Sequence, residues 1–448
     1  MKIAFAYGSE LLGNRALDFR NLWTDKRGMT GSESSLLILA AQLSLLGHEV
    51  TLFIPSPNES QFSGVRLRDL GAMPRESGEF DVVVSFIWSR YLMPPYVTKS
   101  EVVRVNFQTC NSFDYEEEHF EDHVDLFLSP SETHRAYMEP WTVTVGDKWK
   151  VLRLGCFTDD YGVAEKVPGR VAWISSPDRG LHHVLHPDVW PKIKEAVPDA
   201  ELRIFYFGLE GYIGWAAGLT DESEPYLDRR EHGRRARIIR DGLTYPGVRV
   251  MGSTSREDMR RELSEAMVLA FPCDTVLWSE GFSCSTLEGC AAGAVPVLAA
   301  CDAIGDVYRG ACPIVPSSAG EHLAEWRDTV IALLTDPAGH RLWQERAREF
   351  AEKHDYRDIA RDLERMLLEE VERKTSGARR PLSRYAKWLK RPYADGKVWL
   401  PPWVDSLRGV HGECPIYDAE ATRHANLGRR YSYARRERVA AQLAARGE

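Results

Sequence analysis

The chain lacks the features that mark several other classes of protein. Its eight cysteines include no CxxC pair, so their spacing indicates neither a zinc site nor a disulfide framework. No apolar run approaches the roughly 20 residues that span a bilayer, and the first residues, MKIAFAYG, include no apolar stretch long enough for a signal peptide. No GxGxxG follows this first apolar run, which argues against a NAD-dependent dehydrogenase. We therefore expect a cytoplasmic protein with no transmembrane segment and with buried, reduced thiols.

The composition is that of an ordinary globular chain, but the charge is unevenly distributed. At 448 residues the chain is too long for one core, which indicates two domains, and 44% of its residues are hydrophobic. The net charge is −9, yet the segment from Arg373 to the end holds 17 Lys and Arg residues against 7 Asp and Glu residues. This segment therefore carries about +10 and the preceding residues about −19. We expect an acidic body followed by a basic tail.

The first half alternates apolar runs with one clear helical pattern. Residues 2–7 predict a buried strand, a long polar loop follows, and a helix capped by Thr30 or Ser32 ends at Gly47. Residues 48–54 predict the next strand, and this β–loop–α–β order is typical of mononucleotide-binding folds. Further strands are expected at Phe80–Phe86, Val102–Phe107, Val124–Leu128 and Lys150–Leu154.

The same alternation restarts in the second half. Strands are expected at Arg170–Ser175, Glu201–Phe207, Val248–Gly252, Val268–Pro272, Ala294–Ala300 and Ile314–Val315. Helices are expected at Leu181–Val197, Arg229–Gly242, Ser255–Met267, and near 320–336 and 338–355. Two successive doubly wound α/β halves indicate two sheets that face each other across a cleft. The predicted organisation is a Rossmann-like domain at 1–165, a second at 166–358, a helix at 359–374 that returns to the first domain, and a basic aromatic tail at 375–448.

The stretch WSEGFSCSTLEGCAAGAVPV (Trp278–Val297) holds two carboxylates in a setting that suits a phosphorylated sugar. Glu280 lies in an expected loop, and Glu288 lies inside an expected helix capped by Ser283. The free N–H groups in the first turn of such a helix bind anions such as a diphosphate. The alternative is that both acids are solvated surface residues. The apolar and small residues around them favour a nucleotide-sugar site.

These elements together resemble a family 4 glycosyltransferase of the GT-B fold over roughly residues 1–360. The resemblance is carried by TGSES at the first helix, GHEVTLFI after it, SSPDRGL at the start of the second domain, and VRVMGSTSREDM before the acid pair. Its most specific part is SEGFSCSTLE followed by AAGAVPV, which is similar to the E-x7-E element of that family. The resemblance implies a retaining, metal-independent, hexosyltransferase-type enzyme. The first domain would take the acceptor and the second a nucleoside-diphosphate sugar as donor substrate, with no other cofactor.

The resemblance also implies roles for the acid pair. Glu288 would accept hydrogen bonds from both ribose hydroxyls, and Glu280 would contact the transferred sugar or the charge that develops at its anomeric carbon. Gly281 and Phe282 would place backbone near the sugar and the phosphates. Ser283 stands where the family usually has the last Gly of GFG, a departure with a small expected effect because Ser caps helices well.

Arg179, in SSPDRGL, stands where the family places a Lys or Arg just before a Gly at the mouth of a helix. A guanidinium there can neutralise a leaving diphosphate, whereas the alternative is a surface residue in an Asp-Arg turn. Many relatives carry another Arg shortly before this position, where the present chain has Ile174, Ser175 and Ser176. Neutralisation is then expected to depend more on Arg179, on backbone N–H groups or on a further basic residue. No DxD-type acid cluster flanks these elements, which agrees with an absence of metal ligands.

Two glycine-containing loops complete the expected donor site. The resemblance puts Gly31 and Ser32 near the donor phosphate and the acceptor, because a Gly-rich bend lets backbone approach a ligand closely. Capping of the following helix is the simpler alternative. The resemblance also puts Gly252 and Ser253 where backbone contacts the edge of the nucleobase, and an ordinary turn at a strand end is compatible with that role.

The expected acceptor side departs from the family pattern. Relatives often have a His after the fourth strand, whereas this chain has VNFQTCNSFDY, without one. Gln108 and Asn111 can hydrogen-bond a sugar hydroxyl there, but neither can act as a base. Three nearby histidines are expected to be surface or capping residues: His119, His123 and His134.

The tail at 375–448 falls outside the resemblance. It mixes basic residues with Trp388, Trp399 and Trp403, a composition compatible with a strap across the acidic body, with nucleic-acid binding, or with binding to a membrane or partner. The sequence thus predicts a retaining glycosyltransferase whose acceptor is unassigned. Two alternatives stay open: a nucleotide-sugar-binding module that does not transfer, and a glycosyltransferase that acts on modified DNA through its basic tail.

Overall fold

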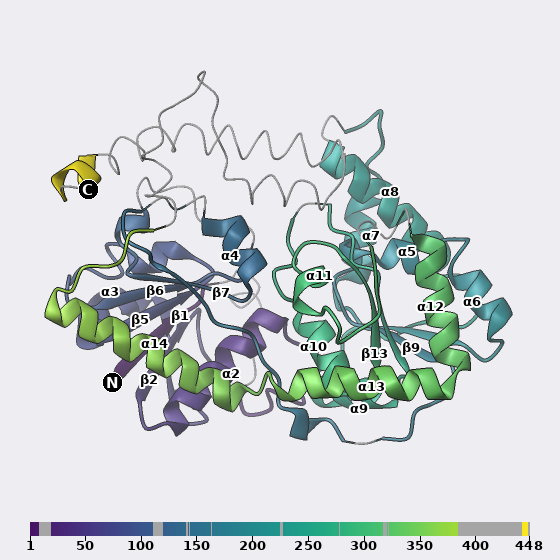
Figure 1. Cartoon of the computed structure of the whole chain (residues 1–448), viewed down its shortest axis with the longest axis horizontal. Helices are drawn as coiled ribbons and strands as arrows, with labels where there is room; N and C mark the ends of the chain where they lie inside the picture. Colours follow the sequence, from purple (N-terminus) through teal and green to yellow (C-terminus); the bar gives the residue numbers. More distant parts are fainter. Residues whose placement is uncertain are drawn as a thin grey trace.

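The fold consists of two α/β lobes side by side, each built on its own sheet (Figure 1). The computed structural model describes residues 1–8, 19–110, 120–139, 142, 144–162, 164–224, 227–276, 278–316, 320, 322–383 and 441–446. Both sheets are almost entirely parallel and are flanked by helices, which confirms the predicted α/β class with two doubly wound halves.

Within the described residues, the sheet of the first lobe has eight strands in the order β3-β4-β2-β1-β5-β6-β7-β8. The strands are β1 (Lys2–Ala6), β2 (Glu49–Ile54), β3 (Gln61–Phe62), β4 (Val65–Asp69), β5 (Val82–Phe86), β6 (Val103–Phe107), β7 (Leu126–Ser129) and β8 (Trp149–Val151). The α-helices of this lobe are α2 (Gly31–Leu45), α3 (Met73–Glu76) and α4 (Glu132–Met138). Every residue of the central strand β5 is buried, as expected for a parallel strand covered on both faces.

The described sheet of the second lobe has six parallel strands in the order β11-β10-β9-β12-β13-β14. The strands are β9 (Arg170–Trp173), β10 (Glu201–Ile204), β11 (Val248–Val250), β12 (Val268–Phe271), β13 (Val295–Ala299) and β14 (Ile314–Val315). The α-helices are α5 (Leu181–Val184), α6 (Trp190–Ala196), α7 (Leu209–Ala216), α8 (Leu227–Gly242), α9 (Arg256–Glu265), α10 (Cys284–Ala291), α11 (Ile304–Val307), α12 (Leu323–Thr335) and α13 (Pro337–Glu352). The carboxyl ends of the strands in both sheets supply loops to the space between the lobes.

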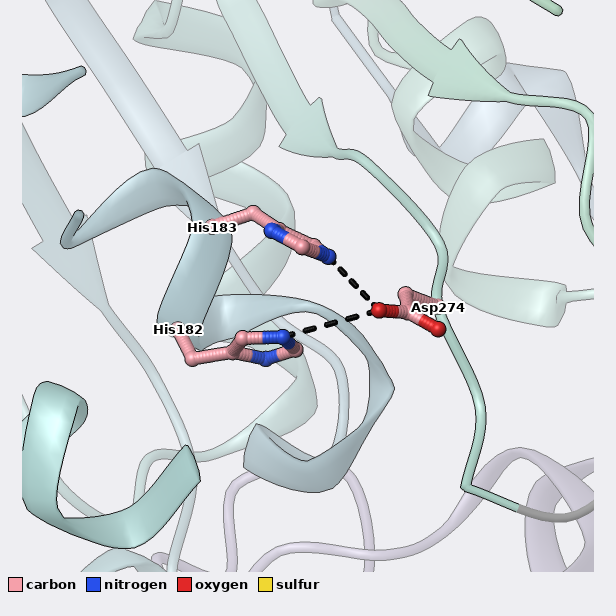
Figure 2. A group of neighbouring side chains, drawn as sticks. All are labelled: His182, His183 and Asp274. Carbon is pink, nitrogen blue, oxygen red and sulfur yellow. Dashed lines mark hydrogen bonds and ion pairs between the residues drawn. The ribbon is translucent and has the colours of Figure 1, made fainter. Parts of the chain in front are cut away.

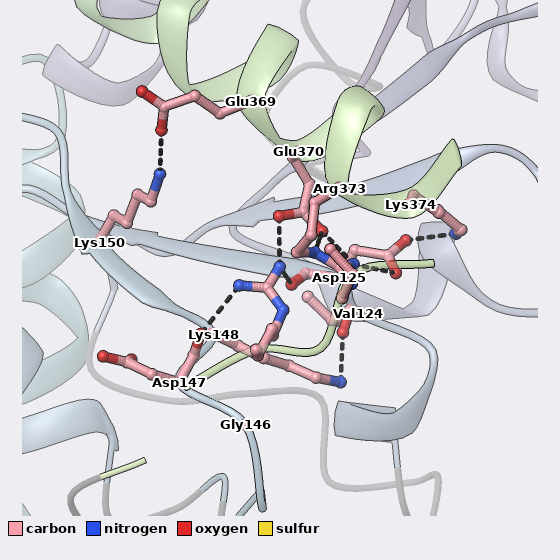
Figure 3. A network of polar contacts seen from close by, with 12 residues as sticks. Val124, Asp125, Gly146, Asp147, Lys148, Lys150, Glu369, Glu370, Arg373 and Lys374 are labelled. Carbon is pink, nitrogen blue, oxygen red and sulfur yellow. Dashed lines mark hydrogen bonds and ion pairs between the residues drawn. The ribbon is translucent and has the colours of Figure 1, made fainter. Parts of the chain in front are cut away.

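Helix α14 (Tyr356–Ser376) belongs to the end of the second lobe in sequence but packs on the first (Figure 1). Lys374 Nζ lies 2.6 Å from Asp125 Oδ2, and Lys150 Nζ lies 2.6 Å from Glu369 Oε2 (Figure 3). The helix therefore occupies the region predicted for a returning helix and extends slightly beyond it at both ends.

After α14 the chain runs along the edge of the first lobe. Arg380 pairs with Glu370 at 2.5 Å and donates a hydrogen bond to the carbonyl of Asp147 at 2.8 Å. Ser383 N donates to the carbonyl of Val145 at 2.8 Å. The first residues of the predicted tail thus lie against the body as a strap. Residues 384–440 lie outside the described part, so the nucleic-acid and membrane hypotheses for the tail stay predictions.

The chain crosses between the lobes twice, and the two crossings lie side by side. Cys156 on the first crossing and Asp355 on the second form a parallel β-bridge. Cys156 N donates a hydrogen bond to the carbonyl of His354 at 2.9 Å. A Cβ on Gly155 would lie 2.7 Å from the same carbonyl oxygen, so only glycine permits this close approach.

Three local predictions differ from the structure. The helix expected at Leu181–Val197 is divided into α5 and α6, because Pro187 lies between them and has no N–H to donate, while Pro191 occupies the first turn of α6. Helix α7 lies in the stretch before α8, where the sequence analysis expected no helix. The hairpin of β3 and β4 was not predicted at all. Among the described helices, none is both long and apolar enough to cross a membrane.

Candidate active site

A cavity of about 390 Å³ lies between the two lobes. Its walls come from the loops that follow β6 and β7 in the first lobe, from the start of α2, and from the loops that follow β9, β10, β11 and β12 in the second lobe. Ligands of doubly wound folds bind at these carboxyl ends of strands, and the volume lies within the range of small-molecule sites.

The cavity brings together the residues that the sequence predicted for the donor and for catalysis. They are Gly31, Ser32, Arg179, Gly252, Ser253, Glu280, Gly281, Phe282, Ser283 and Glu288. These residues come from positions separated by as many as 257 residues, between Gly31 and Glu288. Their convergence is the main reason to treat the cavity as the functional site.

The predicted acceptor-side residues are placed differently. Gln108 is fully buried, and its side-chain carbonyl accepts a hydrogen bond from Cys110 N at 3.3 Å. Gln108 therefore supports the turn after β6, whereas its neighbours Thr109 and Cys110 line the cavity. Asn111 lies outside the described residues.

Glu280 forms an ion pair with Arg179 inside the cavity. The carboxylate raises the pKa of Arg179, which keeps this guanidinium positively charged. Burial raises the pKa of Glu280, and the charge of Arg179 opposes that rise. Since Glu280 is only 6% exposed and Glu288 only 8% exposed, the alternative that both acids are solvated surface residues is wrong.

The loop that carries Glu280 is held by Asp302, a residue that the sequence did not single out. One carboxylate oxygen, Oδ2, accepts hydrogen bonds from Ser279 N at 2.9 Å, from Glu280 N at 2.8 Å and from Thr275 Oγ1 at 3.0 Å. Asp302 has a positive φ of 50° and is 4% exposed. A buried carboxylate that accepts several N–H and O–H bonds fixes the backbone around it. Asp302 therefore fixes the backbone position from which the Glu280 side chain extends.

Glu288 is engaged by Arg256, the first residue of α9. Arg256 Nη1 donates to Glu288 Oε2 at 3.3 Å, and Arg256 Nη2 pairs with Glu288 Oε1. This two-pronged contact is the strong geometry for a guanidinium and a carboxylate. Both residues line the cavity, so Arg256 supplies a cation that the sequence did not locate. In the sequence, Arg256 was only the second residue of the helix expected at Ser255–Met267.

The first turns of α2 and α10 meet across the cavity. Thr30 caps α2 by accepting a hydrogen bond from Glu33 N at 3.3 Å, and Glu33 Oε2 accepts from Thr30 N at 2.7 Å. A Cβ on Gly31 would lie 2.9 Å from Cys284 Cβ, so glycine allows the two helix starts to approach. Their free N–H groups make this part of the cavity suited to an anion.

Ser283 caps α10 in a conformation that favours glycine. Its Oγ accepts a hydrogen bond from Thr286 N at 3.3 Å, while its φ is 73°. The capping predicted for Ser283 is therefore present. The left-handed backbone explains why glycine would fit the same position, and it means that serine here carries a conformational cost of roughly 1–3 kcal/mol.

Arg179 ends a 3₁₀ turn (Pro177–Arg179), and Gly180 follows it with φ 113°. A Cβ on Gly180 would lie 2.2 Å from the carbonyl oxygen of Pro272. Glycine is thus required at position 180 for the turn to pack against the end of β12.

Comparison with solved structures identifies the architecture. Sucrose-phosphate synthase from Thermosynechococcus elongatus superposes with a TM-score of 0.58 at 13% identity, over 82% of this chain and 98% of that one. Anabaena HepE in complex with UDP-glucose superposes with a TM-score of 0.57 at 14% identity, over 82% of this chain and 100% of that one. AviGT4, a glycosyltransferase involved in avilamycin A biosynthesis, superposes with a TM-score of 0.52 at 15% identity, over 85% of this chain and 99% of that one.

The chain has the GT-B fold. No protein-family model and no curated protein sequence matches it, so the likeness is one of structure. The cavity between the lobes is the cleft of this GT-B fold.

His134, on α4, lies behind the wall of the GT-B cleft. It is fully buried, with Nδ1 2.9 Å from Ser129 Oγ and Nε2 3.0 Å from the carbonyl of Cys110. The prediction of a surface or capping residue is therefore wrong, because Ser131 caps α4 and the imidazole fills the space beneath Gly281. Burial lowers the pKa of His134 to about 4, so the ring is neutral at pH 7.

Helix α4 also joins the two lobes. Ser131 Oγ donates a hydrogen bond to the carbonyl of Gly281 at 2.7 Å. The Tyr137 ring stacks on the Trp278 ring with their centroids 4.0 Å apart. These contacts hold the loop of Glu280 against the first lobe.

Outside the cavity, the described residues contain one group of side chains that could hold a metal ion: His182, His183 and Asp274 (Figure 2). The sequence prediction of no metal ligands did not consider this group, because a His-His pair and an Asp far along the chain form no recognisable spacing motif.

Proposed function

We propose that this chain is a retaining glycosyltransferase that moves a sugar from a nucleoside-diphosphate sugar to an acceptor. The observation that carries the proposal is the meeting of two acids, two guanidinium groups and two helix starts in the cleft of a GT-B fold. A similar fold that holds UDP-glucose supports this choice of donor class. UDP-glucose is therefore the first donor to test.

In this proposal the donor lies along α10. The diphosphate accepts hydrogen bonds from the backbone N–H groups after Ser283, where the helix dipole is positive. Glu288 accepts hydrogen bonds from the ribose hydroxyls, and Glu280 contacts the sugar. Backbone near Gly252 and Ser253 contacts the nucleobase.

Arg256 takes the part of the second cation that the segment Ile174–Ser176 lacks. In the structure both Nη atoms of Arg256 are engaged by Glu288. When ribose hydroxyls occupy that carboxylate, the guanidinium is released toward the diphosphate. Together with Arg179, it then balances two negative charges without a metal ion at the diphosphate.

The chemical step breaks the bond between the anomeric carbon and the β-phosphate oxygen, and it forms a bond from the same carbon to an acceptor hydroxyl on the same face. The acceptor proton passes to the departing phosphate oxygen. Arg179 stabilises the negative charge on that oxygen, and Glu280 stabilises the positive charge on the sugar. His134 has no part as acid or base, because it is neutral and lies behind the cavity wall.

Donor hydrolysis without an acceptor tests the proposal. Thermal-shift screening against UDP-, GDP-, ADP- and TDP-glucose first identifies a donor, because a ligand that binds the folded state raises its melting temperature. We expect the wild type to hydrolyse that donor slowly, Glu280→Ala to lose most of this turnover while still binding UDP, and Glu345→Ala, at an exposed acid of α13, to match the wild type.

Two outcomes would oppose the proposal. Donor binding without any turnover that depends on Glu280 would favour a nucleotide-sugar-binding module. An inverted anomeric centre in the released sugar would exclude the retaining step.

A further inference from the structure

Two histidines and an aspartate converge in the second lobe (Figure 2). His182 and His183 are neighbours on α5, and Asp274 lies in the loop after β12. Asp274 Oδ2 lies 2.6 Å from His183 Nε2 and 3.5 Å from His182 Nε2. The three potential ligand atoms all lie within 4.8 Å of one another.

Hydrogen bonding accounts for part of this group only. His183 and Asp274 share a short hydrogen bond, whereas His182 Nε2 makes only a long contact of 3.5 Å with the same carboxylate oxygen. Among the described residues, His182 Nδ1 has no hydrogen-bond partner. His182 is 1% exposed, so solvent does not compensate for this weak pairing. Leaving a buried polar group poorly paired is unfavourable, and such groups call for an explanation.

We propose that His182, His183 and Asp274 bind a divalent transition-metal ion, with Zn²⁺ the ion that best matches the ligands. Two imidazole nitrogens and one carboxylate oxygen are a common protein ligand set for zinc, with water in the fourth position. One ion would engage His182 Nε2, whose present contact is long, and would also hold the other two ligands.

One distance between ligand atoms matches a tetrahedral site, and a second has to change when an ion binds. Metal–ligand bonds of about 2.0–2.1 Å place neighbouring ligand atoms roughly 3.3 Å apart. The distance of 3.5 Å between His182 Nε2 and Asp274 Oδ2 already agrees with this value. The distance of 2.6 Å between His183 and Asp274 has to open as the ion replaces their hydrogen bond.

Arg235 provides a second layer around the site. Its Nη2 lies 3.1 Å from Asp274 Oδ1, the oxygen that does not face the histidines. Its Nε lies 2.8 Å from Glu231 Oε1, which offsets its positive charge near the ion. Hydrogen bonds of this kind orient a ligating carboxylate.

The site is separate from the proposed transfer chemistry. None of its three ligands lines the cavity. Asp274 N donates a hydrogen bond to the carbonyl of Arg179 at 3.4 Å, and Arg235 Nη1 donates to the carbonyl of Asp178 at 2.8 Å. The bound ion would therefore brace the turn that presents Arg179, and its binding does not depend on whether the chain transfers sugars.

The test uses the full-length chain, stripped with a chelator and titrated with Co²⁺ as a coloured substitute for Zn²⁺. We expect visible absorption bands of a tetrahedral Co²⁺ complex that saturate at one ion per chain, their loss on addition of Zn²⁺, and a higher melting temperature with either ion. His182→Leu removes one ligand without leaving an unpaired group, so this variant should fold with at least wild-type stability and lose the bands.

His186→Ala is the matched control, because this half-exposed histidine is close in sequence but is not a ligand. It should keep the bands. Absent bands in the wild type would overturn the proposal. Equal bands in His182→Leu would also overturn it, since the ion would then be held by other residues, such as the histidines of the tail.

Discussion

The ion pair of Arg256 and Glu288 allows a quantitative test of the donor site. The two side chains are 13% and 10% exposed, and the guanidinium contacts both carboxylate oxygens. Removing one partner of a buried pair leaves the other charge uncompensated, which costs roughly 3–5 kcal/mol. We therefore expect Glu288→Ala to lower the free energy of unfolding by about 3 kcal/mol, even in the absence of a ligand.

Replacing both partners should reverse most of this loss. The double variant Arg256→Met/Glu288→Ala leaves no unpaired buried charge, so its free energy of unfolding should exceed that of Glu288→Ala by about 2 kcal/mol or more. The pair Arg361–Asp358, with side chains 61% and 74% exposed, is the control. Its single variants should change the free energy by less than about 1 kcal/mol.

Urea denaturation followed by circular dichroism measures these differences. The reasoning is refuted if Glu288→Ala unfolds at the same urea concentration as the wild type, because Arg256 would then not depend on this carboxylate. A second measurement, the affinity for UDP, tests the proposed movement of Arg256. If Arg256 turns to the diphosphate on binding, Arg256→Gln should weaken UDP binding about 10-fold or more although Glu288 is still present. This factor corresponds to the loss of one charge-assisted hydrogen bond.

Three further predictions concern backbone and pH. Ser283→Gly should raise the free energy of unfolding by about 0.5–1 kcal/mol in thermal denaturation. It relieves a φ of 73°, and this gain is offset in part by a few tenths as a cap and by about 0.5–1 kcal/mol for the greater freedom of glycine in the unfolded chain. A lower melting temperature would contradict this. Gly180→Ala should lower the melting temperature and abolish donor binding, because the added Cβ would lie 2.2 Å from the carbonyl oxygen of Pro272. Gly211→Ala is the control and should do neither, because its added Cβ would have no heavy atom within 4 Å. Because the pKa of His134 falls to about 4 in the folded chain, the unfolded chain binds more protons between pH 6.5 and 4, and stability falls as pH falls through that window. Between pH 7 and 5 the free energy of unfolding of the wild type should fall by about 2 kcal/mol more than that of His134→Gln. Parallel curves of stability against pH for the two proteins would show that His134 does not cause the loss.

Local patterns were sufficient to predict much of this molecule. The capping pair of Thr30 and Glu33 and the apolar run behind it predict α2, because both act within a few residues of each other. The spacing of Glu280 and Glu288 predicts one acid before a helix and one inside it, as observed. Such features depend on residues that are neighbours in the chain, so they can be predicted from a single sequence.

The features that were missed depend on contacts between distant segments. Arg256 is one of several charged residues at the start of α9, and only the folded chain shows that it faces Glu288, 32 residues away. The sequence indicates a surface or capping position for His134, yet the loop of Gly281 from the other lobe buries this side chain. Asp302 was unremarkable for the same reason, since the N–H groups that it binds lie more than 20 residues earlier.

The paired crossings at Cys156 and Asp355 have a consequence for donor entry. Because both connections lie against each other, we expect them to act as one hinge, about which the lobes rotate without stretching either connection. The starts of α2 and α10 lie close to this hinge, since Tyr356 Oη donates a hydrogen bond to Ser35 Oγ at 2.7 Å and Ser35 Oγ lies 3.9 Å from Cys284 Sγ. A rotation that opens the cleft would therefore separate the rings of Tyr137 and Trp278 while the two helix starts stay close together. An incoming diphosphate would then meet an anion site that is already assembled.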